Sequence, residues 1–230
     1  MPELTVNELA RAFKAAIDRQ DAAALTRLAK SYKALYERMQ DKLDSYLLAL
    51  SKFDAPTKAQ AMRLTQYKKL MDALETELGK YAAYVEVEIR NNALAGAELA
   101  VKQTEAFLRA AGYSMPATLP TRAIVNMLGF LQEDSPLWKR LSLLGPENAR
   151  KVADSLLEAV TFGYNPAKTA KMFETAMGGG LTDAMRMSRT AQLYATREAN
   201  RAMYVANEDV VSGWIWWSSL DTDTCMACAV

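Results

Sequence analysis

Two cysteines near the C-terminal end are the residues of this chain best suited to chemistry. Cys225 and Cys228 are separated by two residues, a spacing that suits half of a tetrahedral zinc site or a redox dithiol. A thioredoxin-type dithiol needs a βαβ setting and a helix start, and neither surrounds this pair. Asp221 and Asp223 lie too close in sequence to complete a zinc shell. We therefore expect a half-site in this fragment, without a cofactor, and zinc only in a longer protein.

Histidine is absent from all 230 residues. Its absence removes Ser-His and Cys-His nucleophilic catalysis, imidazole metal ligands and the usual general base near neutral pH. We therefore expect no catalytic residues and a protein that is not an enzyme. The alternative is a metal- or thiol-dependent enzyme completed by residues beyond Val230.

Four arginines recur along the segment 182–209, which we expect to be helical. Arg186, Arg189, Arg197 and Arg201 fall within an arc of about 120° on an α-helix. Such a face suits docking onto an acidic protein surface, and the structural alternative is a solvated basic face. A third interpretation is a nucleic-acid-binding module in which the arginines contact phosphates. Asp183 and Glu198 lie in the same segment and weaken the positive charge.

Three of the four tryptophans fall within residues 214–217. Alternation places Trp214 and Trp216 on one face of a predicted strand and Ile215 and Trp217 on the other. Both faces then need cover, which favours pairing with a further strand. The alternative is a platform on which bases stack.

The composition indicates a folded helical protein. Half of the residues are apolar, and the chain has only 10 Gly and 7 Pro. With 28 basic and 27 acidic residues, the net charge of +1 shows no overall basic excess. The N-terminal residues do not resemble a signal peptide, and no apolar run is long enough for a membrane span. We expect a protein of the reducing cytoplasm, with thiols in place of disulfides and no membrane partner.

The first half of the chain carries the apolar stripes of long amphipathic helices. We expect a short helix over residues 5–19, a second helix from about Asp21 to Phe53 and a third from about Pro56 to Ala111. The second stripe comprises Leu25, Leu28, Tyr32, Leu35, Met39, Leu43, Tyr46, Leu50 and Phe53. The third helix carries Tyr67, Met71, Leu74, Leu78, Tyr81, Val85 and Ile89.

The short connector between these stripes predicts an antiparallel α-hairpin over residues 21–111, in which residues near 35 and 78 face one another. Gly79 and Gly96 are positions where the third helix could bend. The stripes would cover each other, and the hairpin could also project as an arm that docks a partner.

The second half of the chain is predicted to form shorter helices and one strand. We expect helices over 120–131, 136–144, 146–162, 166–177 and 182–209, with Pro136, Pro146 and Pro166 at helix starts and Gly178–Gly180 as a helix end. The fold class is mainly all-α: a long N-terminal hairpin, then a compact helical domain ending in a short Trp-rich strand and a Cys-x-x-Cys loop. The domains are expected at 1–112 and 113–230, the second one incomplete at its C-terminus.

The C-terminal segments together resemble the head-morphogenesis family of tailed bacteriophages, the minor head proteins of the Mu F-like type. The resemblance covers about residues 163–230. It rests on Ser188-Arg189-Thr190, on 194–201, on Trp214 and Trp216, and on Asp221 and Thr224 followed by the cysteine pair. The chain departs from the family pattern at Ala191, usually Glu, and at Asp223, often basic. The family continues beyond the second cysteine with a later His/Cys cluster, whereas this chain ends at Val230.

The resemblance implies a structural virion protein. Such a protein would be made in the host bacterial cytoplasm and held inside the head at the portal vertex. Its main partner would be the portal protein, with the major capsid protein and packaged DNA as further partners. The implied role is in head assembly, and in genome packaging or ejection.

Overall fold

Long helices account for most of the residues that the computed structural model describes, which are 5–54, 56–114, 116–120, 123 and 135–213. In chain order they are α1 (Val6–Leu50), α2 (Lys58–Arg63), α3 (Thr65–Ala110), α5 (Pro136–Thr161) and α6 (Pro166–Ala206). The described residues contain no strand, so the mainly all-α class is confirmed. The predicted Trp-rich strand and Cys-x-x-Cys loop lie outside the described residues, as does nearly all of the helix expected over 120–131.

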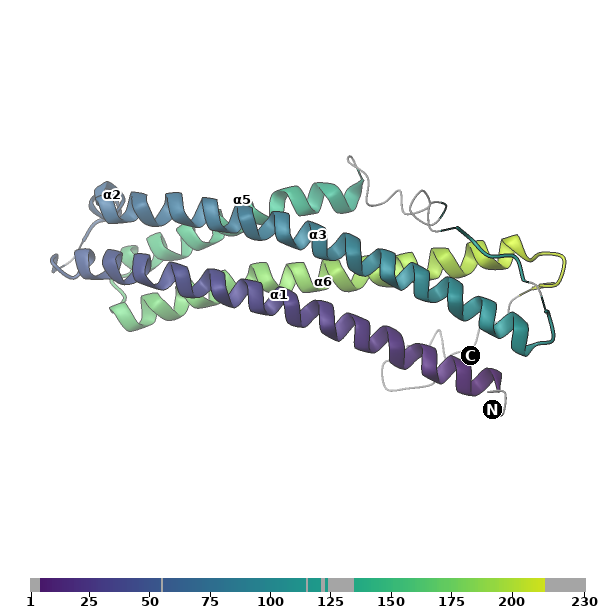
Figure 1. The fold of residues 1–230 in the computed structure, drawn as a ribbon. Coiled ribbons are helices and arrows are strands. Elements are labelled where there is room, and N and C mark those ends of the chain that lie inside the picture. The colour runs from purple at the N-terminus through teal and green to yellow at the C-terminus, as the bar shows by residue number, and fades with distance from the viewer. Residues whose placement is uncertain (1–4, 55, 115, 121–122, 124–134, 214–230) are drawn as a thin grey trace.

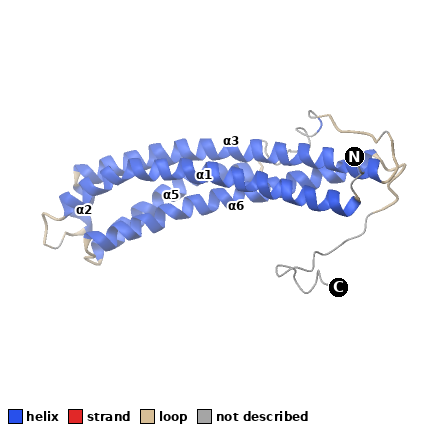
Figure 2. Ribbon diagram, turned by 60° about the horizontal axis from the view of Figure 1, so that its bottom comes forward, coloured by secondary structure: helices blue, strands red, loops and turns tan. Residues whose placement is uncertain are grey.

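The four long helices lie side by side in one elongated bundle (Figure 1). α3 and α6 form the central pair. They run parallel, since the residues that bond across the pair advance together along both helices: Asn92 bonds to Ser188, and Thr104 bonds to Asn200. α1 and α5 lie beside this pair (Figure 2) and run in the opposite direction, as the colour order in Figure 1 shows. One hydrophobic core extends through all four helices. None of the described helices is both long enough and apolar enough to cross a membrane.

α1 is a single helix of 45 residues, so the expected break before Asp21 is wrong. The helix begins at a capping box in which Thr5 accepts a hydrogen bond from the Glu8 amide and the Glu8 carboxylate accepts one from the Thr5 amide. The polar residues that suggested a break instead reach other helices. Gln20 donates to the Asn92 carbonyl of α3, and Asp21 pairs with Arg189 of α6.

The antiparallel hairpin of α1 and α3 is confirmed, with the predicted register. The Tyr32 and Tyr81 rings lie 4.9 Å apart, edge to face, and Arg38 pairs with Glu77 at 2.7 Å. These contacts bracket residues 35 and 78, which therefore face one another. The Tyr32 hydroxyl also donates to the Met177 carbonyl of α6, so this layer joins three helices.

The second arm of the hairpin is divided, whereas we expected one helix from Pro56 to Ala111. α2 begins at Lys58, two residues beyond Pro56, after the N-cap Thr57, which forms a capping box with Gln60. Leu64 then adopts an extended conformation with ψ of 132° and separates α2 from α3. α3 itself continues through Gly79 and Gly96 without a break.

The hairpin does not project as a free arm in the described part of the chain. α5 and α6 lie along α3, because α3 has a second buried face besides the one that meets α1. This face includes the small residues Ala93, Gly96, Ala97 and Ala100, which let another helix approach closely. The division of the chain into two domains at residue 112 or 113 stays a prediction.

Pro146 does not begin a helix, because α5 continues through it from Pro136 to Thr161. A proline at this position removes one backbone hydrogen bond, to the carbonyl of Ser142. Both Ser142 and Pro146 are exposed, so water can bond to that carbonyl. The adjacent Gly145 is buried, and a β-carbon there would lie 3.2 Å from the Leu78 carbonyl oxygen of α3. The Gly-Pro pair thus marks a close helix crossing.

The glycine triplet 178–180 does not end a helix either, since α6 runs unbroken for 41 residues. Gly180 is buried against α5, where a β-carbon would lie 2.9 Å from Asn148 Nδ2. Gly178 and Gly179 have no such neighbour within 4 Å. Packing between α5 and α6 therefore outweighs the low helix propensity of the triplet.

Two of the described helices, α3 and α5, are followed by a glycine at positive φ. Gly163 (φ 62°) follows α5, and the amide of Tyr164 reaches back to the Ala159 carbonyl. Asn165 then caps α6 by accepting a hydrogen bond from the Lys168 amide. At the other end of the bundle the buried Asn207 side chain bonds both the amide and the carbonyl of Ala117, which holds the segment after α3.

The glycine triplet gives a test of the continuous α6. Gly178→Ala and Gly179→Ala are expected to raise the free energy of unfolding by about 0.5–1 kcal/mol each, because alanine favours the helix and meets nothing. Gly180→Ala is expected to lower it by about 1 kcal/mol, because the added methyl group displaces the Asn148 amide from the Leu144 carbonyl. Urea unfolding followed by circular dichroism measures all three. Equal effects of the three substitutions would contradict the packing at Gly180.

Candidate docking face

The side of α6 that points away from the bundle carries the four predicted arginines. Arg186, Arg189, Arg197 and Arg201 are all exposed, as the helical arc predicted. Three large apolar side chains are exposed between and beside them: Leu193, Tyr194 and Val205, at 54%, 41% and 57%. We call these seven residues the outer face of α6.

Most of the positive charge on the outer face is matched by carboxylates. Arg201 lies 3.2 Å from Glu198, and Arg186 lies 3.9 Å from Asp183, both within α6. Arg197 makes no ion pair with any residue that the structure describes. The face is therefore a mixed polar and apolar surface with one unmatched cation, and not a strongly basic stripe.

Arg189 has a contact that the sequence did not indicate. Its Nε lies 3.2 Å from Oδ2 of Asp21 on α1, and the Asp21 side chain is only 8% exposed. Burial raises the pKa of Asp21 above its ordinary value, and the nearby Arg189 guanidinium partly offsets this rise. Arg189 therefore holds α1 against α6 and lies at the edge of the outer face.

The opposite side of α6 fixes the orientation of the outer face. Four polar residues at four-residue intervals line it: Ser188, Gln192, Thr196 and Asn200. Ser188 accepts a hydrogen bond from Asn92, and Asn200 accepts one from Thr104. Because these bonds are buried or partly buried, rotating α6 would leave polar groups unpaired, which costs about 1–3 kcal/mol each. The inner row thus orients the arginines.

Several polar atoms of this region lack a hydrogen-bond partner among the described residues. They are Asp21 Oδ1, Gln192 Oε1 and Thr196 Oγ1, all buried. Thr196 and Gln192 lie directly against Gly96 of α3, where a β-carbon would approach Thr196 Oγ1 to 2.9 Å. The close approach of α3 and α6 therefore carries an energetic cost in buried polar groups.

The inner row and the pairing of Arg189 with Asp21 were missed in the sequence. The signal was present, because a second polar stripe at i, i+4 spacing beside the arginine stripe indicates a helix whose buried side is also polar. A polar buried stripe needs a polar or small partner, and residues 92–104 of α3 offer both.

The remaining predicted site residues lie outside the described residues. These are the cysteine pair, Cys225 and Cys228, and the motif residues Trp214, Trp216, Asp221 and Thr224. In the part of the chain that is described, no three His, Cys, Asp or Glu side chains are grouped so as to hold a metal ion. The zinc half-site and the partner-binding role of the arginines stay predictions.

The ion pair of Asp21 and Arg189 predicts that substitutions of the two residues have non-additive effects on the free energy of unfolding. Arg189→Ala leaves a buried carboxylate without its cation and is expected to lower the free energy of unfolding by about 1–3 kcal/mol at neutral pH. Asp21→Asn removes the buried charge, so Arg189→Ala should cost much less in that background. Urea unfolding of the four proteins in this double-mutant cycle measures the coupling. Additive effects would show that the pair contributes nothing.

The raised pKa of the Asp21 carboxyl group predicts that the stability of the protein depends on pH. Because its pKa is raised in the folded state, the folded protein binds the proton more tightly than the unfolded chain. The contribution of Asp21 to stability is therefore greatest below its ordinary pKa and is lost as the pH rises through the raised value. The free energy of unfolding of the wild type, measured relative to that of Asp21→Asn, should therefore fall as the pH rises from 3 to 7. A constant difference across that range would contradict the raised pKa.

Comparison with known proteins assigns no family to this arrangement. No family model, curated protein or solved structure matches the chain. The outer face of α6 is therefore characterised by its own geometry: four arginines on a helix that three neighbours hold in place.

Proposed function

We propose that this chain is a structural protein, and not an enzyme, that docks onto a protein partner through the outer face of α6. The resemblance of residues 163–230 to minor head proteins suggests the portal protein of a tailed bacteriophage as that partner. On this proposal the chain belongs inside the phage head, where it acts in assembly and in genome packaging or ejection.

The observation that carries the proposal is the surface around Arg197. Its guanidinium has no ion-pair partner in the described part, and the exposed Leu193 and Tyr194 lie beside it on the same side of α6. Arginine and aromatic residues with adjacent apolar area are enriched at the centres of protein interfaces. An acidic or carbonyl-rich partner surface would satisfy Arg197 and cover the apolar side chains.

The support beneath this surface favours tight docking. α6 contacts α1, α3 and α5 along its length, and Asn200 and Ser188 hold its inner side to α3. A preformed helix loses little conformational freedom when it binds, so more of the contact energy appears as affinity.

Nucleic-acid binding is the alternative function, and the pairing of the arginines makes it less favoured. Arg186, Arg189 and Arg201 already contact carboxylates, which would have to release them to phosphates. Phosphate binding depends on such unmatched cations and falls steeply with salt.

Co-expression with the portal protein of the same phage tests the proposal. Arg197→Glu and Leu193→Asp are expected to weaken co-sedimentation with portal rings by about tenfold or more, which is the effect of losing an interface hot spot. Val87→Asp, at an exposed apolar position in the middle of α3, is the matched control and should bind normally. Circular dichroism establishes that all three variants remain folded.

Two different results would contradict the proposal. Normal portal binding by both outer-face variants would overturn the docking assignment. Salt-sensitive binding of a DNA duplex that Arg197→Glu abolishes, without any portal binding, would favour the nucleic-acid alternative.

A further inference from the structure

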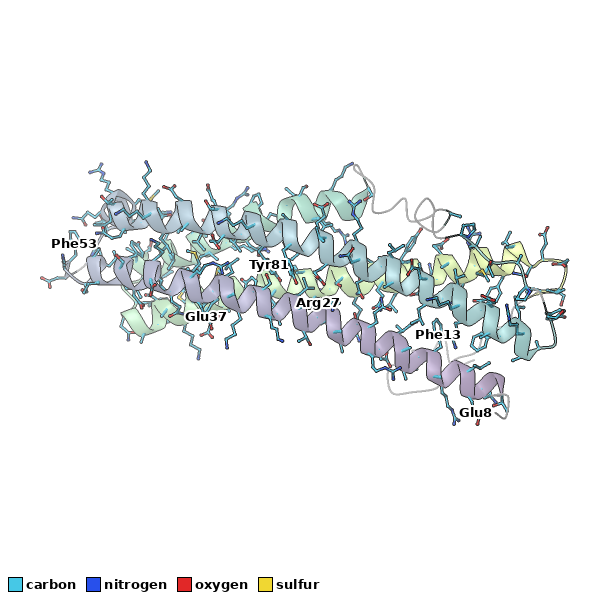
Figure 3. The ribbon with its side chains drawn as sticks, viewed as in Figure 1. Glu8, Phe13, Arg27, Glu37, Phe53 and Tyr81 are labelled. Atoms are coloured by element: carbon cyan, nitrogen blue, oxygen red, sulfur yellow. The ribbon has the colours of Figure 1, made fainter. Side chains whose placement is uncertain are left out.

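A second surface with unmatched groups lies at the end of the bundle that is farthest from Arg197. It comprises the described residues of 47–68 and 158–169, where α1 passes to α2 and α3 and where α5 turns into α6. We call this region the turn end. It is the end at which Phe53 is drawn (Figure 3).

The turn end exposes large apolar side chains. Leu48 is 68% exposed, Phe162 64%, Met62 47% and Phe53 39%. They come from three different parts of the chain, so they are not the edge of one amphipathic stripe. Four large apolar residues gathered on one end need an explanation that scattered surface residues do not.

The turn end is also hollowed. A cavity of about 620 Å³ opens between the end of α1 and the turn between α5 and α6. Its apolar lining comes from Leu47, Leu50, Phe53, Pro56, Val160 and Tyr164. A volume of this size accommodates one or two large side chains of a partner.

The walls of this cavity are held in defined positions. Gly163 at positive φ and the bond from the Tyr164 amide to the Ala159 carbonyl fix the turn after α5. The capping box of Thr57 fixes the start of α2 on the other side. The cavity is therefore formed before any partner binds.

The charge at the turn end differs from that of the whole chain. Five cationic side chains, Lys52, Lys58, Arg63, Lys68 and Lys168, stand against two carboxylates, Asp54 and Glu158, in a protein whose net charge is +1. All seven residues are exposed. None of the five cations forms an ion pair with a described residue, and Lys168 lies over the Tyr164 ring, 3.2 Å from its centroid.

From these features we infer that the turn end is a docking site for an acidic protein segment that carries large apolar side chains, such as an amphipathic helix. The apolar side chains of that segment would enter the cavity and cover Phe53, which lines it, and Phe162, which stacks on Tyr164, while its carboxylates would meet Lys52 and Lys58. This is the helix-in-groove type of recognition, in which apolar anchors supply affinity and charges supply orientation.

Two other occupants fit these observations less well. A second copy of the chain docked end to end would bring the unmatched cations of both molecules together, which is unfavourable. A bilayer surface could take up the exposed apolar side chains, but a flat surface leaves a cavity unfilled. The acidic apolar segment satisfies the charge and the shape together.

Binding of a synthetic probe to the purified protein tests the inference. The probe is a fluorescent peptide of glutamates with leucine and phenylalanine at helical i, i+3, i+4 and i+7 spacing. One control peptide has lysine in place of glutamate, and a second has serine in place of the apolar residues. Fluorescence anisotropy is expected to show saturable binding of the acidic apolar peptide alone, weakened when salt rises from about 50 to about 300 mM.

Variants of the turn end locate the binding. Phe53→Glu/Phe162→Glu and Lys52→Glu/Lys58→Glu are each expected to weaken peptide binding by about tenfold or more. The matched controls, Val87→Glu and Lys30→Glu/Lys102→Glu, change exposed residues on the flanks and should bind normally. If the apolar double variant does not fold, the lysine variant alone decides. Arg197→Glu should also bind normally, so this test is independent of the outer face of α6.

Four results would overturn the inference. The first is no binding of the acidic apolar peptide up to about 1 mM. The second is equal binding by turn-end and control variants. The third is self-association of the protein that the turn-end variants abolish, which would assign the surface to a second copy. The fourth is binding to phosphatidylcholine and phosphatidylglycerol vesicles without peptide binding, which would assign it to lipid.

Discussion

The close parallel contact between α3 and α6 is the constraint on which the rest of the structure depends. At Gly96 there is no room even for a methyl group, because Thr196 Oγ1 would lie 2.9 Å away and Gln192 Cγ 3.1 Å away. Small neighbours such as Ala97 and Ala199 are fully buried beside it. A shift of one helix by a residue would place a side chain where Gly96 now stands and would break the bonds of the inner row of α6. The contact thus fixes both the spacing and the register of the central pair.

This contact also decides what α6 presents to the solvent. The inner row lies on the buried side of α6, so the outer face points away from the bundle. Arg189 lies at the border between the two sides and pairs with Asp21 of α1, whereas Arg197 has no ion-pair partner among the described residues. Arginines that are equivalent on the sequence-based arc therefore differ in the structure, and the difference comes from the neighbouring helix.

The sequence predicted those features that depend on local periodicity, and it failed where one helix contacts another. The stripes around Leu35 and Leu78 predicted the hairpin and its register, because apolar residues at three- and four-residue steps must face a partner. Asp21, Pro146 and Gly178–Gly180 predicted breaks, because their intrinsic preferences disfavour helix interiors. Asp21 is tolerated because it pairs with Arg189, and Gly180 because it packs against Asn148, both contacts far away in sequence. Pro146 is tolerated because the carbonyl that it leaves unbonded is on an exposed residue. For the site, the arginine arc and the nearby carboxylates of α6 were predictable, whereas the Asp21 carboxylate that pairs with Arg189 from α1 was not.

The two surfaces of the bundle are separated by the length of a rigid helix. From Asn165 at the turn end to Arg197 on the outer face, α6 advances about 48 Å at 1.5 Å per residue. The large side chains of the core, such as Phe173 and Tyr46, fill the half near the turn end, and the small and polar residues of the α3–α6 contact fill the other half. Neither half contains a hinge, because α6 is unbroken between them. Two partners bound at these surfaces would be held at a fixed separation and orientation, which a flexible linker cannot impose. The continuity of α6 through its glycine triplet is therefore a functional requirement of such an arrangement as well as a result of packing.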